Sequence, residues 1–346
     1  MGRPIALRLA EETEVRDRLG RPLRDLRISL IDRCNYRCPY CMPEDRYPRD
    51  AEFLAARERL SPAEIERLVR LFAAEGVSKV RLTGGEPLLR RDIAEITSRI
   101  AAIDGIRDLA LTTNGALLES CAEELKAAGL GRITVSLDAL DPEQFRRMSG
   151  GRGCVADVLE GIAAAERAGF DALKINSVIQ RGRNEDQVLP LCERFRGTQH
   201  VLRFIEYMDV GTCNGWREED VVTAPELRDR IAARWPLEPV EPGYRGEVAQ
   251  RYRYSDGAGE IGFVASVSAP FCGDCHRARL SADGRLYTCL FAAQGHDLRG
   301  PLRAGAEDEE LVRIVRQVWG ARGDRYSELR GRAGGGAHVE MYRIGG

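Results

Sequence analysis

Short β-branched and leucine-rich runs alternate with longer stretches of helical spacing over the first two thirds of the chain. Such runs predict buried strands, and apolar residues at every third or fourth position predict helices packed against them. Six strands are expected: Leu26–Ile31, Lys79–Thr83, Asp108–Thr112, Arg132–Leu137, Leu173–Val178 and Val201–Tyr207. Because strand and helix alternate along the chain, the pattern predicts an α/β fold with a parallel sheet and right-handed crossovers.

The best-marked helix begins after residue 60. Ser61 is placed as its N-cap, Pro62 as its first residue and Glu64 as the partner that completes a capping box. Gly76 follows the last apolar residue of the pattern and predicts the end of the helix. Similar spacing predicts further helices at Arg91–Ile103, Leu118–Ala128, Val155–Ala168, Glu185–Phe195 and Glu307–Trp319.

The alternation weakens after residue 211. Prolines at 236, 239 and 242 predict a linker at 232–245. We therefore expect two units: residues 1–235, which hold the parallel sheet, and residues 236–346, a smaller C-terminal domain. Residues 331–346 are rich in glycine, and their composition alone predicts a disordered tail.

Composition narrows the functional classes. The 346 residues carry 52 Lys and Arg against 54 Asp and Glu, a formal net charge of −2. This balance argues against a dedicated nucleic-acid binder, which needs a strong basic excess. Because no run of 18 apolar residues and no apolar signal core is present, we expect a cytosolic protein without a membrane partner. Its ten cysteines are then not expected to form structural disulfides.

Three cysteines, Cys34, Cys38 and Cys41, follow the first expected strand at spacings of four and three positions. A tight loop with this spacing can direct three sulfurs at one centre, and thiolates favour zinc or iron–sulfur clusters. Structural zinc prefers four ligands, and the loop has no fourth Cys or His nearby. A [4Fe–4S] cluster held by three thiolates leaves one iron open to a small ligand. A zinc site completed from elsewhere in the chain is the alternative.

A second set, Cys272, Cys275 and Cys289, lies near the C-terminus. It predicts either a second [4Fe–4S] cluster with one open iron or a Cys₃His zinc site that uses His276 or His296. Arg277 and Arg279 come directly after the CxxC pair, and alternation in an extended segment places them on the same side. The remaining cysteines are interpreted as packing residues: Cys121, Cys154, Cys192 and Cys213.

The first set resembles the radical S-adenosylmethionine (SAM) superfamily, including the aromatic Tyr40 between the last two cysteines. The segment Arg81–Pro87, with the sequence RLTGGEP, resembles the superfamily loop that contacts the SAM amino group. From its chemistry, Glu86 could accept a hydrogen bond from an ammonium group.

Further segments resemble one family, the GTP 3′,8-cyclases. They are Leu26–Asn35, Arg81–Pro87, Arg203–Asp209 and the second cysteine set with its arginines. The resemblance runs from about residue 12 to the terminal Gly345-Gly346. It implies an incomplete (βα)6 barrel of the TIM type, with a C-terminal α+β domain that carries a second iron–sulfur cluster. It also implies the first step of molybdenum cofactor biosynthesis, in which radical chemistry joins C3′ and C8 of GTP.

The resemblance assigns roles to individual residues. Two [4Fe–4S] clusters would be held by Cys34, Cys38, Cys41, Cys272, Cys275 and Cys289. SAM would be contacted by Tyr40, Gly85, Ser136 and Met208. GTP would be contacted by Arg27, Arg81, Thr112, Lys174, Arg277, Ala278 and Arg279. The catalytic residues would be Arg277, Arg279, Gly345 and Gly346. Several of these residues lie on different expected strands, so in a barrel they can converge on one cavity, and a triphosphate needs several cations.

The implied partners are an electron donor and cyclic pyranopterin monophosphate synthase, the next enzyme of the pathway. The sequence leaves the oligomeric state open, with a homodimer as one option. Two other functions were weighed. One is a radical SAM maturase that modifies peptides, although such enzymes usually carry more C-terminal cysteines. The other is a non-catalytic zinc-binding interaction module, which would contain zinc and no sulfide.

Overall fold

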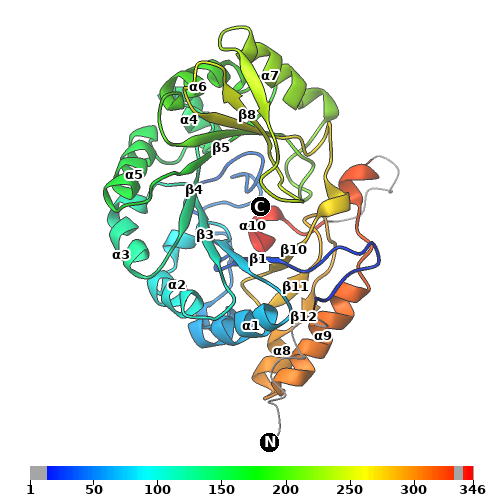
Figure 1. Ribbon diagram of the computed structural model, residues 1–346. Helices are drawn as coiled ribbons and strands as arrows, with labels where there is room; N and C mark the ends of the chain where they lie inside the picture. The colour runs from blue at the N-terminus through cyan, green and yellow to red at the C-terminus, as the bar shows by residue number, and fades with distance from the viewer. Residues whose placement is uncertain (1–13, 331–337, 346) are drawn as a thin grey trace, which may run out of the picture.

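A computed structural model describes residues 14–330 and 338–345. Six parallel strands stand side by side in chain order and form most of a ring (Figure 1). They are β1 (Asp25–Ser29), β2 (Lys79–Thr83), β3 (Asp108–Thr113), β4 (Arg132–Ser136), β5 (Lys174–Ile179) and β6 (Val201–Glu206). Each lies within a residue or two of its expected position, and the expected barrel-type α/β fold is confirmed.

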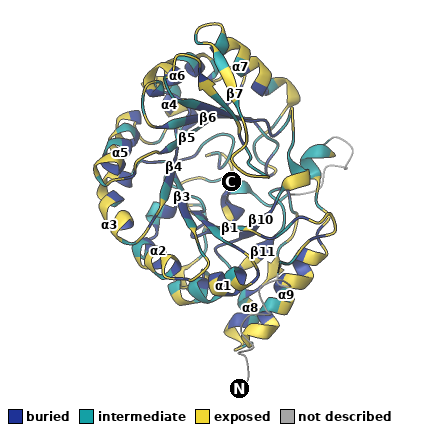
Figure 2. Ribbon diagram, viewed as in Figure 1, coloured by how far each residue is buried: buried dark blue, intermediate teal, exposed yellow. Residues whose placement is uncertain are grey.

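Helices cover the outside of this ring. They are α1 (Pro62–Ala74), α2 (Ile93–Ala101), α3 (Ala122–Ala127), α4 (Pro142–Met148), α5 (Val155–Arg167), α6 (Val188–Phe195) and α7 (Ala224–Ala232). Figure 2 shows their outward faces exposed and their inward faces buried against the strands. The capping box of α1 is present: Ser61 Oγ accepts from Glu64 N at 3.2 Å, and Ser61 N donates to Glu64 Oε2 at 2.7 Å. Sequence analysis missed α4 and α7.

The C-terminal third adds strands to both edges of the same sheet. Within the described residues the order is β12-β11-β10-β1-β2-β3-β4-β5-β6-β9-β8-β7. Because β10 pairs parallel to β1 and β9 pairs parallel to β6, eight neighbouring strands of this sheet are parallel. The added strands are β7 (Leu237–Val240), β8 (Gln250–Tyr254), β9 (Glu260–Val264), β10 (Arg277–Leu280), β11 (Arg285–Tyr287) and β12 (His296–Asp297).

The linker expected at 232–245 is in part a strand. β7 lies inside it and pairs antiparallel with β8, with Pro239 opposite Tyr252. β7 is the edge of the sheet, where a proline is tolerated because its missing N–H does not interrupt a central ladder. The division into residues 1–235 and 236–346 stays a prediction.

The last helices are α8 (Arg299–Arg303), α9 (Asp308–Gly320) and α10 (Met341–Ile344). α9 packs beside α1, whereas α10 lies inside the ring of strands (Figure 1). The disorder expected from composition is wrong for residues 338–345, because Tyr342 and Ile344 are buried. Residues 331–337 and Gly346 lie outside the described part of the chain.

Candidate active site

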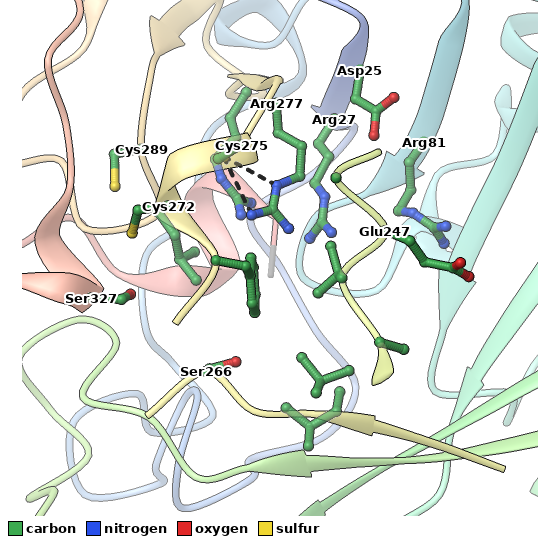
Figure 3. A pocket seen from close by; sticks show the side chains of 18 of the residues that line it. Asp25, Arg27, Arg81, Glu247, Ser266, Cys272, Cys275, Arg277, Cys289 and Ser327 are labelled. Atoms are coloured by element: carbon green, nitrogen blue, oxygen red, sulfur yellow. Dashed lines mark hydrogen bonds between the residues drawn. The ribbon is translucent and has the colours of Figure 1, made fainter. Parts of the chain in front are cut away.

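One cavity lies within the ring of strands and collects side chains from both its edges and its middle. Its lining includes these residues singled out from the sequence: Arg27, Arg81, Thr112, Lys174, Met208, Cys272, Cys275, Arg277, Arg279 and Cys289. Figure 3 shows Arg277, Arg27 and Arg81 in a row that leads away from the three cysteines. The sequence-based expectation that these residues converge on one cavity is therefore met, although what the cavity binds is a separate question.

Other expected residues lie elsewhere. Ala278 is fully buried between Arg277 and Arg279, and neighbouring residues of a strand point to opposite faces. Tyr40, Gly85 and Ser136 are not part of the cavity lining. They belong to the region around the first cysteine loop, at the carboxyl ends of the strands.

Hydrogen bonds fix several cationic side chains of the cavity. Arg81 Nη1 donates to Thr112 Oγ1 at 2.9 Å and to Thr134 Oγ1 at 3.1 Å. Arg203 Nη2 donates to Asn176 Oδ1 at 2.7 Å. Because these partners sit on strands, the guanidinium groups are held in place before any ligand arrives, which reduces the entropy cost of binding.

The cavity concentrates positive charge. Burial, followed by the charges of Arg279 and Arg277, lowers the pKa of Arg27 well below its ordinary value. Burial and Arg203 lower the pKa of Lys174 to about 7, and burial and Arg277 lower that of Arg279 to about 10. Each shift reports that another positive charge is unfavourable there. An anion with several negative charges would relieve this repulsion.

The second cysteine set lies at one end of the cavity. Cys272 begins a short 3-10 turn, and Arg277 directs Nε and Nη2 at Cys275 Sγ, at 3.4 and 3.3 Å. Burial alone would raise the pKa of Cys275, but the charges of Arg277 and Arg322 outweigh it and lower the pKa to about 5. Cys275 is thus set up as a thiolate, the form that binds metals.

A buried ion group that sequence analysis missed holds the backbone of this loop. Arg21 Nη1 donates to Cys272 O at 2.7 Å, and Arg322 Nη1 donates to Cys275 O at 2.6 Å. Asp17 Oδ2 joins the two guanidinium groups, at 2.5 Å from Arg21 Nε and 3.3 Å from Arg322 Nη1. All three side chains are almost completely buried. Asp17 and Arg21 are neighbours in sequence, but Arg21 is 251 positions from Cys272 and Asp17 is 305 positions from Arg322, so no local pattern predicts the group as a whole.

His276 was the possible fourth ligand of a zinc site, but it lies beside Asp25 and not with the three cysteines. Its Nδ1 lies 3.5 Å from Asp25 Oδ2, and the residue is not part of the cavity lining that holds the three cysteines. Among the described residues no three His, Cys, Asp or Glu side chains are placed to ligate a single ion. In an iron–sulfur cluster each thiolate binds its own iron, so the sulfurs need not meet at one point.

The first cysteine loop follows β1 and is held against the GGEP loop. Glu86 N donates to Arg33 O at 2.9 Å, and Gly85 N donates to Ile31 O at 2.7 Å. A Cβ on Gly85 would lie 2.2 Å from Arg33 O, so only glycine permits this approach. The cysteine loop turns on itself, since Cys41 N donates to Cys38 O at 3.0 Å.

The thiols of this loop are buried, and for Cys34 burial outweighs the nearby charge of Arg37. Burial and the nearby Glu86 raise the pKa of Cys34 to about 12, and burial and Cys34 raise that of Cys38. Tyr36 N donates to Cys34 Sγ at 3.4 Å. An all-thiolate donor set of this kind suits iron–sulfur or zinc chemistry, and bound metal would supply the missing positive charge. The residues present therefore fit a cluster.

Glu86 links the GGEP loop to the end of β3. Its side chain is almost fully buried, with Oε1 accepting from Thr113 Oγ1 at 2.7 Å and Oε2 accepting from Asn114 N at 2.8 Å. Burial raises its pKa to about 7. That the carboxylate also accepts from a ligand ammonium stays a prediction.

Tyr40 points from the cysteine loop toward β4 and β5. Its hydroxyl donates to Asp138 Oδ2 at 2.6 Å, and Asp138 Oδ1 accepts from Val178 N at 2.8 Å. Ser136 is the last residue of β4, two positions before Asp138. Two residues expected to contact SAM therefore belong to one neighbourhood beside the first cysteine loop.

The C-terminal tail lies inside the ring, beside the ends of β1 and β2. Gly345 has φ of 71°, and a Cβ there would lie 2.2 Å from Thr83 Cγ2 at the end of β2. Arg279 Nη1 donates to Ile344 O at 3.2 Å, which links the tail to the cavity arginines. Gly346, the other expected tail residue, lies outside the described residues.

Comparisons with known proteins place these features. A model of the radical SAM superfamily matches residues 28–195, and a model of molybdenum cofactor synthesis C matches residues 200–328. A protein of Xanthomonas campestris pv. campestris named GTP 3′,8-cyclase is 63% identical over 96% of this chain and 97% of its own length. This chain belongs to the GTP 3′,8-cyclase family.

More distant GTP 3′,8-cyclases span the chain equally well. The Acidothermus cellulolyticus protein is 51% identical over 91% of this chain and 88% of its own, and a Staphylococcus aureus protein is 46% identical over 92% and 93%. Among solved structures, SuiB of Streptococcus suis bound to S-adenosylmethionine matches with a TM-score of 0.61 at 15% identity. That match covers 86% of this chain and 68% of SuiB. It supports the radical SAM fold of the family.

Membership also bears on cofactors and location. The match to the radical SAM superfamily supports the use of SAM and an iron–sulfur cluster by this chain. Within residues 14–330 and 338–345, no helix is both long and apolar enough to cross a membrane.

Proposed function

We propose that this chain converts GTP to (8S)-3′,8-cyclo-7,8-dihydroguanosine 5′-triphosphate, the first step of molybdenum cofactor biosynthesis, in the cavity described above. The observation that carries the proposal is the union, in one cavity, of buried cations from several strands with the three cysteines of the second set. A nucleoside triphosphate matches both parts, because its phosphates need cations and its base can reach a metal centre.

We assign two [4Fe–4S] clusters to the two cysteine sets. Cys34, Cys38 and Cys41 would hold one, beside SAM contacts at Tyr40, Gly85, Ser136 and Met208. Cys272, Cys275 and Cys289 would hold the other. When bound, the first cluster and SAM supply the 5′-deoxyadenosyl radical that removes hydrogen from C3′ of GTP. Because a carbon radical is quenched by nearby C–H and S–H hydrogen donors, the ring of strands must keep other such groups away from the substrate.

The chain's own residues then bind and orient GTP. Arg81, fixed by Thr112 and Thr134, and Lys174 and Arg27 would pair with the triphosphate. Arg277 and Arg279, with Ala278 between them, bring the base end toward the second cysteine set. Gly345 and Gly346 would pack the tail against the bound nucleotide, next to C3′ and C8. These residues fix geometry, which is the main protein contribution when a cofactor carries the chemistry.

The partners follow from the reaction. The cyclised nucleotide would pass to cyclic pyranopterin monophosphate synthase, and an electron donor must reduce the first cluster. We propose the cytosol as the site of this exchange, and a homodimer remains one option for the assembly.

The direct test is anaerobic incubation of the reconstituted protein with GTP, SAM and dithionite. The expected products are 5′-deoxyadenosine and the cyclised nucleotide in equal amounts, with about eight iron and eight sulfide per chain. Zinc without sulfide, or deoxyadenosine formed only with a peptide substrate, would refute the proposal. As a matched pair, Arg81→Ala should lose GTP binding, whereas the exposed Arg107→Ala should keep it.

A further inference from the structure

A second cavity, here called the arginine groove, lies beside the first cysteine loop. It is lined by residues that follow β1 and β2, by the segment before α1 and by the last residue of α8. Its arginines are Arg33, Arg57, Arg59, Arg90, Arg91 and Arg303, and its only lining carboxylates among the described residues are Asp32 and Asp92. In a chain of net charge −2, this is a marked local excess of positive charge. The active site described above uses none of these arginines.

Two of the arginines, Arg90 and Arg303, hydrogen-bond to the backbone that forms the groove. Arg90 donates from Nη1 to Leu30 O at 2.9 Å and from Nη2 to Leu60 O at 2.7 Å, and it also pairs with Asp92. Arg303 donates from Nη1 to Arg57 O at 2.7 Å and from Nη2 to Arg59 O at 2.9 Å. These bonds fix the backbone of residues 57–60, so the shape of the groove does not depend on a ligand.

The side chains of the other four arginines, Arg33, Arg57, Arg59 and Arg91, have no hydrogen-bond or ion-pair partner among the described residues. The guanidinium of Arg33 lies over the Phe53 ring, 5.5 Å from its centroid. Burial and the charge of Arg90 lower the pKa of Arg59. Asp92 pairs with Arg90 and Glu64 pairs with Arg303, so the groove keeps a net positive charge that the chain neutralises only in part, on a rigid frame.

The groove is joined directly to the cysteine loop. Arg33 precedes Cys34 in the chain, and its carbonyl accepts from Glu86 N at 2.9 Å. Asp32 Oδ2 accepts from Leu54 N at 2.9 Å, which ties the segment before α1 to the same loop. By contrast, Arg33 and its groove neighbours do not line the substrate cavity inside the ring. The groove therefore offers approach to the first cysteine loop from outside the substrate cavity.

We propose that the arginine groove docks an acidic electron-carrier protein that delivers one electron at a time to the first cluster. The inference rests on the proposed function, which requires a reductant for the cluster held by Cys34, Cys38 and Cys41. In each delivery the carrier loses one electron and the cluster gains it, with no atom or proton transferred. Complementary charge steers such encounters and orients weak, short-lived redox complexes, whose interfaces are small.

The test compares two reductants and two matched variants. The groove variant is Arg57→Glu with Arg91→Glu, both exposed and without side-chain partners among the described residues. The control variant is Arg107→Glu with Arg194→Glu, also exposed; Arg107 directly precedes β3 and Arg194 lies in the last turn of α6, and neither lines the arginine groove. Both change the formal charge equally. Each protein is assayed for 5′-deoxyadenosine and cyclised nucleotide with dithionite, and then with a reduced flavodoxin of net negative charge over a range of NaCl concentrations.

With flavodoxin at low salt, the groove variant should turn over about ten-fold more slowly than wild type and should lose most of its salt dependence. With dithionite, all three proteins should be equal, because a small reductant needs no docking. Equal flavodoxin-driven rates in the groove and control variants would overturn the proposal, and so would a groove variant that also loses its dithionite-driven rate. Wild type that makes no product with dithionite would instead refute the proposed function.

Discussion

The two cysteine loops carry the same number of thiols, and burial raises the pKa of Cys289 in the second as it does in the first, but one thiol of the second, Cys275, has a strongly cationic surrounding. At the first loop, burial and Glu86 raise the pKa of Cys34 to about 12. At the second, Arg277 and Arg322 overcome burial and lower the pKa of Cys275 to about 5. The second loop is held by Arg21 and Arg322 and lines the cavity rich in cations, whereas the first is held by backbone contacts with the GGEP loop and by its own Arg37, whose Nη1 donates to Cys34 O at 2.8 Å. From this difference we propose a division of labour, with SAM at one loop and an anionic substrate at the other.

The largest expected effect separates the loops by function. Cys34→Ala should abolish SAM cleavage, because the reducing centre is lost. Cys272→Ala should still form 5′-deoxyadenosine but should give no cyclised nucleotide. Both products are measured in one anaerobic assay. Normal cyclisation by Cys272→Ala would mean that the second loop has no part in substrate binding.

The tail should matter almost as much. Gly345→Ala introduces a Cβ that would lie 2.2 Å from Thr83 Cγ2 at a φ of 71°. We expect cyclisation to fall about 100-fold through misplacement of the tail, with slow, uncoupled formation of deoxyadenosine. Gly197→Ala is the matched control, since Gly197 has φ of 79° but open space around its missing Cβ. If both variants lose cyclisation equally, backbone strain rather than the tail's position is responsible.

Deleting Gly345 and Gly346 should act like Gly345→Ala, and near-normal cyclisation by the truncated protein would show that the tail is not part of the active site.

Replacing Asp17 should lower stability and disrupt the second cysteine loop, but it should leave the first loop functional. Asp17→Asn leaves two buried arginines without their shared carboxylate, a change that costs about 3–5 kcal/mol of folding free energy. We expect a lower denaturation midpoint and loss of the second cluster's iron, while SAM cleavage persists. Asp308→Asn, which breaks the exposed ion pair with Arg67, should cost under about 1 kcal/mol. Equal losses in both variants would contradict a special role for the buried ion group.

The smallest effect concerns pH. Burial and the charges of Arg203, Arg132 and Arg81 lower the pKa of Lys174 to about 7 in the free cavity. A bound triphosphate should raise that pKa, so binding takes up a proton above pH 7. GTP affinity should then fall by up to about ten-fold per pH unit above 7 until the pKa of the complex is reached. In Lys174→Met this part of the dependence should vanish from titrations of GTP binding. Identical pH profiles in the two proteins would rule Lys174 out.

The sequence predicted what is encoded locally. The six strands were visible as short apolar runs, and the capping box of α1 as Ser61, Pro62 and Glu64. The cavity residues on different strands were predicted to converge, because the strands of a barrel bring distant positions together. The composition of the tail predicts disorder, because its many glycines mask the few apolar residues that bury α10.

Contacts between distant segments were out of reach. Nothing near Asp17 indicates that it pairs with Arg322, and nothing near Glu86 indicates that its carboxylate accepts from Thr113 and Asn114. Prolines around β7 predict a linker, because Pro239 within the strand is tolerated only at a sheet edge, and that position depends on the whole sheet.

The most direct test of the division of labour uses two proteins that each hold one cluster. In one, Cys34, Cys38 and Cys41 are replaced by Ala; in the other, Cys272, Cys275 and Cys289 are replaced. The electron paramagnetic resonance spectrum of each reduced protein is recorded alone, with SAM and with GTP. The account predicts that SAM changes only the spectrum from the first loop and that GTP changes only the spectrum from the second. A spectrum from the second loop that responds to SAM and not to GTP would contradict it.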